Sequence, residues 1–111
     1  MIIKKPWGYE EIWAKSPSYI GKKINIFSGK RMSLQYHEKK EETILVISGE
    51  LRVWSNEDDN DFLVLKKGDS YHVSPGLVHR FGCGESEGVI LIEVSTTELQ
   101  DVVRIKDDFG R

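Results

Sequence analysis

Apolar and polar residues follow one another along this chain in the manner of short β-strands separated by turns. β-Branched and aromatic runs recur between clusters of Gly, Pro, Asn and Asp, and no long stretch has the apolar period of a helix. The pattern predicts strands at residues 10–15, 20–27, 31–36, 43–48, 51–55, 62–66, 70–73, 79–82 and 89–95. Short strands at this spacing are typical of a jelly-roll barrel, so we predict an all-β fold.

Two segments do not share the strand pattern. Residues 56–61 are polar and acidic, which predicts a solvated hairpin tip between the strands on either side. Residues 97–111 mix apolar and charged side chains, and we expect a short helical turn there, just before Asp101. Because the chain has no linker, low-complexity tract or internal repeat, residues 1–111 are predicted to form a single domain.

The predicted strand at 43–48 has an unusual pattern, because residues 43–47 are apolar or β-branched at every position. One face of this strand would line the barrel, and the other face would need a cover. Trp7, Tyr9, Ile12 and Trp13 add apolar surface that could serve the same contact. In a chain of 111 residues a second subunit is a natural cover, so we predict a homodimer.

Charge and cysteine content exclude several classes of protein. Sixteen basic and eighteen acidic residues give a net charge of −2, without the basic excess that nucleic-acid binding needs. The apolar runs are too short to cross a bilayer, and the first residues lack the apolar region of a signal peptide. The single cysteine cannot form an internal disulfide, so we expect a cytoplasmic protein with neither nucleic acid nor membrane as partner.

Two clusters combine turn glycines with metal-ligating residue types. They read Gly29-x5-Gln35-x-His37-x4-Glu42-x6-Gly49 and Gly68-x5-Ser74-Pro75-Gly76-x2-His79-x3-Cys83. Two imidazoles, a carboxylate and an amide oxygen suit zinc, manganese, cobalt, nickel or ferrous iron better than a thiophilic ion. We therefore predict one divalent metal ion, with zinc preferred, held by Gln35, His37, Glu42 and His79. Gln35 could instead hydrogen-bond a metal-bound water, and His72 is predicted to lie at the surface or an interface.

The double motif resembles the signature of cupins, which are small double-stranded β-helix barrels that hold one metal ion. Three further segments are similar to mannose-6-phosphate isomerases: KPWGYE at 5–10, LQYH at 34–37 and DVVRIKDDFGR at 101–111. Those isomerases also place a Gln in the first ligand position. The resemblance covers nearly the whole chain and is strongest to the cupin domain that ends the bifunctional, type II enzymes. It implies an isomerase domain that stands alone.

Strand alternation places two more polar residues near the predicted ligands. Ser33 precedes Gln35 by two residues and Lys40 precedes Glu42 by two, so both are predicted to point into the same cavity. Lys40 could position a sugar hydroxyl or pass a proton, or it could belong to a charged turn. In the isomerases that this chain resembles, a Ser and a Lys at these positions line the active site.

The resemblance also implies active-site roles for Glu93 and Arg104. A carboxylate at position 93, inside an apolar strand, is costly unless it faces a polar cavity, which supports the same role independently. Arg80 and Arg104 are candidates to bind a substrate phosphate, because a guanidinium can contact its oxygens bidentately. Lys23 is a further candidate, and any of the three could form only surface ion pairs.

The leading hypothesis is a metal-dependent isomerase that interconverts mannose 6-phosphate and fructose 6-phosphate. The metal would stabilise an enediolate, Glu93 or Lys40 would move the proton, and Arg104 would orient or neutralise the developing charge. Because the chain has no nucleotide-binding Gly-rich loop, we expect the guanylyltransferase half of the type II enzymes to be absent. The alternatives are a non-catalytic, metal-containing sugar-binding or regulatory module and an iron dioxygenase.

Overall fold

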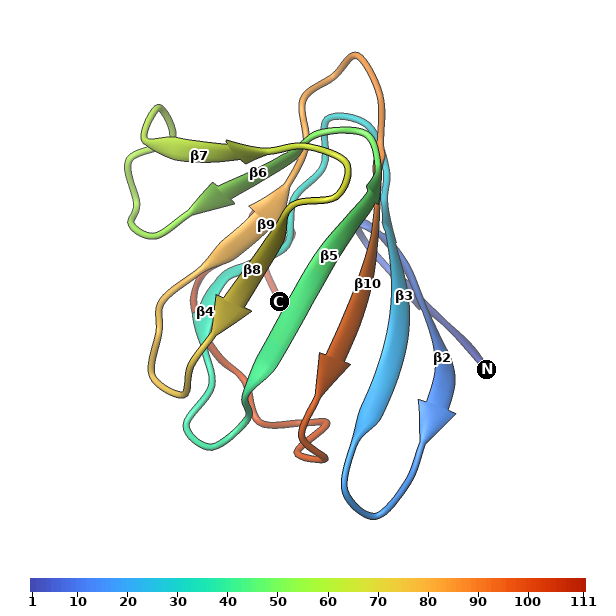
Figure 1. Ribbon diagram of the computed structural model, residues 1–111. Coiled ribbons are helices and arrows are strands. Elements are labelled where there is room, and N and C mark those ends of the chain that lie inside the picture. The colour runs from blue at the N-terminus through green and yellow to red at the C-terminus, as the bar shows by residue number, and fades with distance from the viewer.

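Eleven β-strands and no helix make up the protein in a computed structural model, which describes residues 1–111 (Figure 1). The strands are β1 (Ile2–Lys5), β2 (Gly8–Lys15), β3 (Ile20–Ile26), β4 (Leu34–Tyr36), β5 (Glu42–Ser48), β6 (Leu51–Trp54), β7 (Phe62–Leu65), β8 (Ser70–Val73), β9 (Arg80–Gly82), β10 (Val89–Ser95) and β11 (Val103–Lys106). No helix in the structure has the length and hydrophobicity needed to cross a bilayer.

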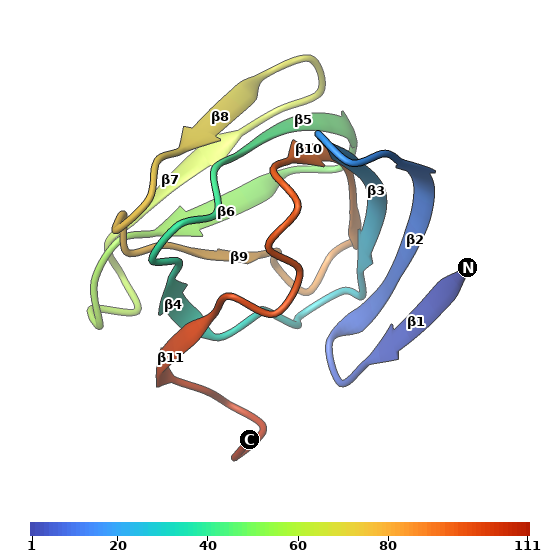
Figure 2. The ribbon, with the colours of Figure 1, turned by 90° about the horizontal axis from the view of Figure 1, so that it is seen from below.

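The strands form a large sheet that curls against two smaller ones. The large sheet has the order β1-β2-β3-β10-β5-β8, and the smaller sheets pair β7-β6-β9 and β11-β4, all antiparallel. Single bridges from Arg31 to Gly82 and from Gln35 to His79 join the two smaller sheets along β9. Seen along its length, the molecule is a barrel whose sheets surround a central interior (Figure 2). The predicted all-β barrel is confirmed.

Alternate residues of the large sheet point into the barrel, and most of them are apolar. In β5 and β10, and in β3 apart from buried Gly21, the buried positions occur at every second residue, as expected when one face of a strand meets a core. Thirteen buried apolar residues form a continuous cluster, to which all three strands contribute together with β6, β8 and β9. This cluster fills one end of the barrel.

The interior changes from apolar to polar part-way along the same strands. In β10, Val89 and Leu91 are followed on the inner face by Glu93 and then Ser95, all of them buried. β5 begins with buried Glu42 before it enters the apolar cluster. The polar positions therefore gather at the end of the barrel toward which the β10 arrow points in Figure 1.

The predicted strand map is largely correct, with three differences. β1 and β11 were not predicted: each has only four residues, and β1 lies at a sheet edge, where the apolar signal is weak. The predicted strand at 31–36 is shortened to Leu34–Tyr36. The predicted helical turn before Asp101 is wrong, because residues 97–102 form a bend and a turn without any helix.

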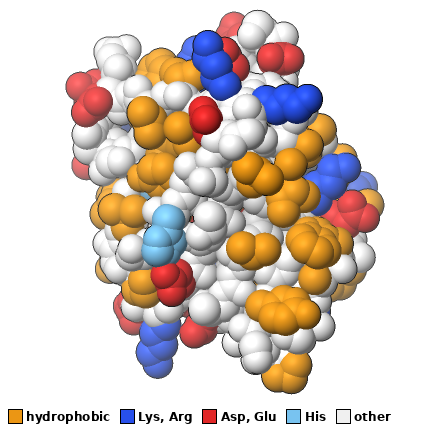
Figure 3. Space-filling model, viewed as in Figure 1, with side chains coloured by type: hydrophobic (Ala, Val, Ile, Leu, Met, Phe, Trp, Pro, Cys, Tyr) orange, Lys and Arg blue, Asp and Glu red, His pale blue; other side chains and the backbone are white.

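The outer face of the large sheet carries the apolar residues that suggested a second subunit. Leu45 and Ile47 of β5 are each 39% exposed, while Ile44 and Val46, which alternate with them, are buried in the core. Val94 of β10 is also exposed on this side, and apolar side chains gather here in the space-filling view (Figure 3). The homodimer stays a prediction, and light scattering tests it: a monomer at micromolar concentration would contradict it.

Candidate metal centre

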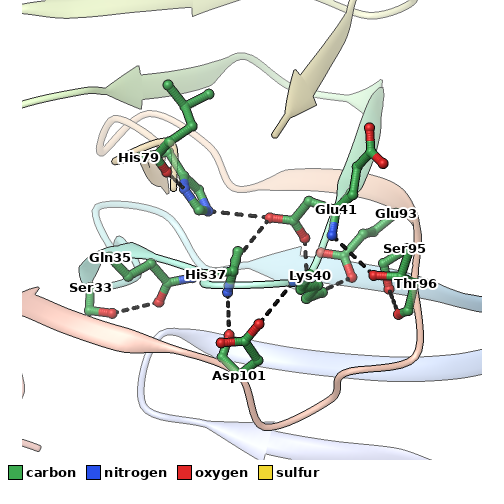
Figure 4. Close-up of polar contacts among 12 residues, drawn as sticks. Ser33, Gln35, His37, Lys40, Glu41, His79, Glu93, Ser95, Thr96 and Asp101 are labelled. Atoms are coloured by element: carbon green, nitrogen blue, oxygen red, sulfur yellow. Dashed lines mark hydrogen bonds and ion pairs between the residues drawn. The ribbon is translucent and has the colours of Figure 1, made fainter. Parts of the chain in front are cut away.

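Three predicted ligands, His37, Glu42 and His79, meet at the polar end of the barrel. His37 follows β4, Glu42 begins β5 and His79 immediately precedes β9. The Nε2 atom of His79 lies 3.2 Å from Oε1 of Glu42, and the Nε2 atom of His37 lies 3.4 Å from the same oxygen. The candidate ligand atoms all lie within 4.8 Å of one another, and all three side chains are buried. The fold therefore brings the three residues together, and Figure 4 shows the rings of His37 and His79 within this group.

The hydrogen bonds of the two imidazoles leave their Nε2 atoms free to bind an ion. Nδ1 of His79 donates to the carbonyl oxygen of Leu77 at 2.9 Å, and Nδ1 of His37 donates to the carbonyl oxygen of Asp101 at 2.5 Å. Such contacts place the proton on Nδ1 and direct the Nε2 lone pair at the metal position. Both Nε2 atoms are buried without a hydrogen-bond partner. Because a buried, unpartnered polar atom is destabilising, this donor set fits a divalent cation.

Gln35 lies beside this group on β4. Its bridge to His79 places both side chains on the same face, and its Oε1 accepts a 2.7 Å hydrogen bond from Oγ of Ser33. If the side-chain amide of Gln35 turned by half a turn, its oxygen would point at the histidines. Ser33 would then accept a hydrogen bond from the amide nitrogen, because a hydroxyl both donates and accepts. Gln35 as the fourth ligand stays a prediction. Ser33 is fully buried against Gln35, and its contact with a substrate stays a prediction.

Lys40 and Glu93 lie next to the carboxylate of Glu42. The Nζ atom of Lys40 is 3.2 Å from Oε2 of Glu42 and 3.5 Å from Oε2 of Glu93. Burial alone would lower the pKa of Lys40, but the charges of Glu93 and Glu42 outweigh it and raise that pKa. Burial, reinforced by the charge of Glu42, holds the pKa of Glu93 well above its usual range. Burial therefore favours the protonated form of Glu93, and the neighbouring carboxylates favour the ammonium form of Lys40.

Sequence reasoning missed a second ion pair in the same wall of the barrel. Lys22 lies opposite Glu93 in the β3–β10 ladder, and its Nζ atom is 3.1 Å from Oε1 of Glu10. Its position at an inward, every-second-residue site of β3 was the available signal. We predicted Lys23 instead, and this needs correction: Lys23 alternates with buried Lys22 and Ile24 and therefore faces outward.

Asp101 holds the loop between His37 and Glu42 in place, although no role was predicted for it from the sequence. Its carboxylate accepts hydrogen bonds from the backbone N–H groups of Glu38, Lys39 and Lys40 at 2.7–3.0 Å. These backbone donors hold the pKa of Asp101 below its usual range. Because its carbonyl also accepts from His37, this one residue fixes both the loop and a ligand. The only sequence signal was its place at the start of the DVVR segment.

Arg80 does not reach the site, so its predicted phosphate role also needs correction. Its side chain is 1% exposed and donates from Nε to the carbonyl of Met32 at 2.9 Å and from Nη2 to that of Lys106 at 3.1 Å. The guanidinium also lies 3.6 Å from Asp108. Arg80 thus ties the C-terminal segment to the barrel wall and has no open face for a ligand.

A cleft opens over the metal centre between the N-terminal strands and the segment that leads into β11. Counted with its open mouth, it has a volume of about 530 Å³. Its lining combines the site residues with cations and apolar side chains: Lys5, Trp7, Glu10, Lys22, Met32, Gln35, His37, Lys40, Leu99, Asp101, Val102, Arg104 and Arg111. Arg104 thus lies where the sequence placed it, at the cleft. Glu93 is not part of the lining and lies behind Lys40.

The topology and the His–Glu–His group define a cupin, a class in which metal binding is common. The structure is similar to a double-stranded β-helix protein from Klebsiella pneumoniae, with a TM-score of 0.76 and 19% identity over 92% of this chain and 87% of that one. It is also similar to an RmlC-like cupin from Shewanella frigidimarina, with a TM-score of 0.74 and 24% identity over 90% and 86%. At these identities the similarity establishes the fold.

The family within this class follows from sequence comparison. Residues 1–107 match the family model of the mannose-6-phosphate isomerase C-terminal domain, so the chain belongs to that family. It is 32% identical to a mannose-1-phosphate guanylyltransferase of Escherichia coli and 30% identical to the alginate biosynthesis protein AlgA of Pseudomonas aeruginosa, in each case over 98% of this chain. The match spans only 23% of the length of each relative. The resemblance found in the sequence is confirmed.

Proposed function

We propose that this chain is a metal-dependent aldose–ketose isomerase that interconverts mannose 6-phosphate and fructose 6-phosphate. The observation that carries the proposal is the position of Lys40. It lines the cleft beside the ligand group and contacts both Glu42 and Glu93, a buried carboxyl whose pKa burial raises. An isomerase needs such a proton-carrying pair next to a site that can bind sugar oxygens.

Each residue of the site has a distinct part in this proposal. A divalent ion held by His37, Glu42 and His79 would supply Lewis-acid chemistry to the sugar oxygens. Lys40 contacts the substrate and hydrogen-bonds the oxygen on which negative charge develops as the proton moves between C1 and C2. Glu93, behind Lys40, is hydrogen-bonded to it, so one of the two in its unprotonated form takes the proton from one sugar carbon and returns it to the other. Arg104, exposed at the cleft, orients the substrate by its charge.

The test is conversion of mannose 6-phosphate to fructose 6-phosphate by purified protein. The protein is stripped with a chelator and then given zinc, manganese, cobalt, nickel or ferrous iron. We expect turnover to disappear on chelation and to return with at least one ion. Lys23→Ala is a matched control, because its side chain faces away from the cleft and its turnover should be unchanged. Metal-loaded protein that shows no turnover with any ion would contradict the proposal.

A metal-containing sugar-binding module is the second candidate function. It is favoured by the length comparison, because the similar proteins are named as guanylyltransferases and this chain covers only 23% of them. In a longer protein such a domain can bind a sugar phosphate without converting it. Tight binding of mannose 6-phosphate without conversion would identify this function. Oxygen consumption with ferrous iron would instead indicate dioxygenase chemistry.

A further inference from the structure

The charged side chains around the cleft are paired, with two exceptions. Lys22 pairs with Glu10 at 3.1 Å, Lys40 with Glu42 at 3.2 Å, and Arg111 with Asp107 at 2.8 Å. The carboxylate of Asp101 is taken up by three backbone N–H groups. The side chains of the remaining two cations, Lys5 and Arg104, have neither a hydrogen bond nor an ion pair in the structure.

These two cations lie at the junction between the cleft and a wider outer groove. Lys5 ends β1, and Arg104 belongs to β11. Both also line the outer groove, whose other walls include the apolar residues Met1, Ile3 and Ile12. Lys5 and Arg104 therefore mark the passage through which a ligand reaches the metal centre.

The register of the strands relates Arg104 directly to the metal site. Arg104 lies opposite Gln35 in the β11–β4 ladder, and Gln35 is bridged in turn to His79. Residues directly opposite each other in antiparallel strands place their side chains on the same face. Arg104, Gln35 and His79 thus form one row that runs from the cleft mouth to the metal ligands.

We propose that Lys5 and Arg104 form an anion clamp that binds the phosphate group of the substrate at the cleft mouth. An unpaired guanidinium can contact two phosphate oxygens, and an ammonium adds a second positive charge. The sugar then extends inward along the row to Lys40 and the metal ligands. This inference rests on the proposed function for the identity of the sugar, but binding of the phosphate does not require turnover.

The test measures binding of mannose 6-phosphate, mannose and inorganic phosphate to metal-loaded protein by calorimetry. Lys5→Gln and Arg104→Gln each remove a charge-assisted hydrogen bond to the phosphate, so each should weaken mannose 6-phosphate binding roughly 10- to 100-fold. Both variants should also weaken inorganic phosphate and leave the binding of mannose unchanged. Lys4→Gln is the matched control: it is the neighbouring, exposed residue of β1, does not line the cleft, and should change none of the three affinities.

The outcomes separate this inference from the proposed isomerase. Unchanged mannose 6-phosphate affinity in Lys5→Gln and Arg104→Gln would overturn the clamp even if turnover is present. An equal loss of affinity for mannose and for mannose 6-phosphate would overturn it as well, because the residues would then act on the whole site. Selective loss of phosphate affinity in protein that never converts the sugar would support the clamp and reject the isomerase.

Discussion

The two ends of the barrel interior are built by the same strands and differ in almost every chemical respect. β3, β5 and β10 contribute Ile24, Val46 and Leu91 to the apolar end, each no more than 1% exposed. Within one or two inward positions the same strands contribute Lys22, Glu42 and Glu93, which are nearly as deeply buried. The backbone ladder continues across the change without a break in β3 and β10. The strand framework therefore accepts either kind of interior.

The difference in the polarity of the buried side chains means that the two ends contribute differently to the stability of the fold. Burial of apolar side chains stabilises the fold by about 25 cal/mol per Å² of surface removed from water. Burial of charged groups is unfavourable unless they are closely paired, and replacement of such pairs by apolar residues is often neutral or stabilising. The stability of the fold therefore comes mainly from the apolar end, whereas the polar end carries the candidate metal ligands.

Removal of a metal ligand should have the largest effect, and it should act on the polar end. Loss of a residue that only orients a metal ligand typically lowers metal affinity roughly 10- to 100-fold. In His79→Ala, which loses a ligand itself, we expect a larger fall in metal affinity and no turnover. Metal content after gel filtration and the isomerase assay measure both. His72→Ala is the control, because His72 is an exposed histidine that pairs with Glu41. Full metal occupancy in His79→Ala would remove this residue from the ligand set.

A cavity at the apolar end should lower the stability of the fold and leave metal affinity unchanged. Leu91→Ala removes a fully buried side chain, and we expect a loss of about 2–5 kcal/mol in the free energy of unfolding with metal affinity retained. Denaturant unfolding and metal titration provide the two values. Val94→Ala on the exposed face of the same strand should cost less than about 0.5 kcal/mol. A loss of metal affinity in Leu91→Ala comparable to that in His79→Ala would mean that the two ends are not separable.

Asp101→Asn tests the contact that holds the loop at the edge of the polar end. An amide nitrogen cannot accept hydrogen bonds, so the variant loses part of the contact with the backbone of residues 38–40. We expect metal affinity to fall roughly 10- to 100-fold, as for other partners that orient ligands. Glu38→Gln, on the same loop and exposed, is the control for a metal titration. Equal affinities in the two variants would show that the carboxylate contact with residues 38–40 does not help to position the ligands.

The smallest expected effect concerns the C-terminal segment outside the barrel. Arg31 contacts both carboxylate oxygens of Asp108, at 2.6 and 3.0 Å, and this hydrogen bonding lowers the pKa of Asp108. A lowered carboxyl pKa stabilises the folded state above the unfolded value of 3.8, and this stability is lost as the pH falls below it. Asp108→Asn should reduce the free energy of unfolding by less than about 1 kcal/mol at pH 7.

The control and the pH range make this small effect measurable. Denaturant unfolding is followed from pH 7 to about pH 3, and Glu57→Gln, an exposed hairpin residue without a side-chain contact, should follow the parent protein. The difference between Asp108→Asn and the parent protein should shrink as the pH falls. A difference that does not change with pH would show that the Arg31 contact is not its source.

The sequence predicted the parts of the molecule that depend on local pattern. The alternating strands of the barrel and the spacing of His37, Glu42 and His79 were sufficient for the fold and for three ligands. Lys22 was missed in favour of Lys23, because a shift of one residue exchanges the two faces of a strand. Arg80 was misassigned because its partners are backbone carbonyls, which no residue type reveals.

Asp101 also determines when the metal centre can form during synthesis. His37 is oriented by a carbonyl that lies 64 positions later in the chain, and the loop that precedes Glu42 is held by the same distant residue. A ribosome that has released only the first ten strands would present the three ligands without the contact that aligns them. The aligned metal centre is therefore expected to form only after residue 101 has emerged.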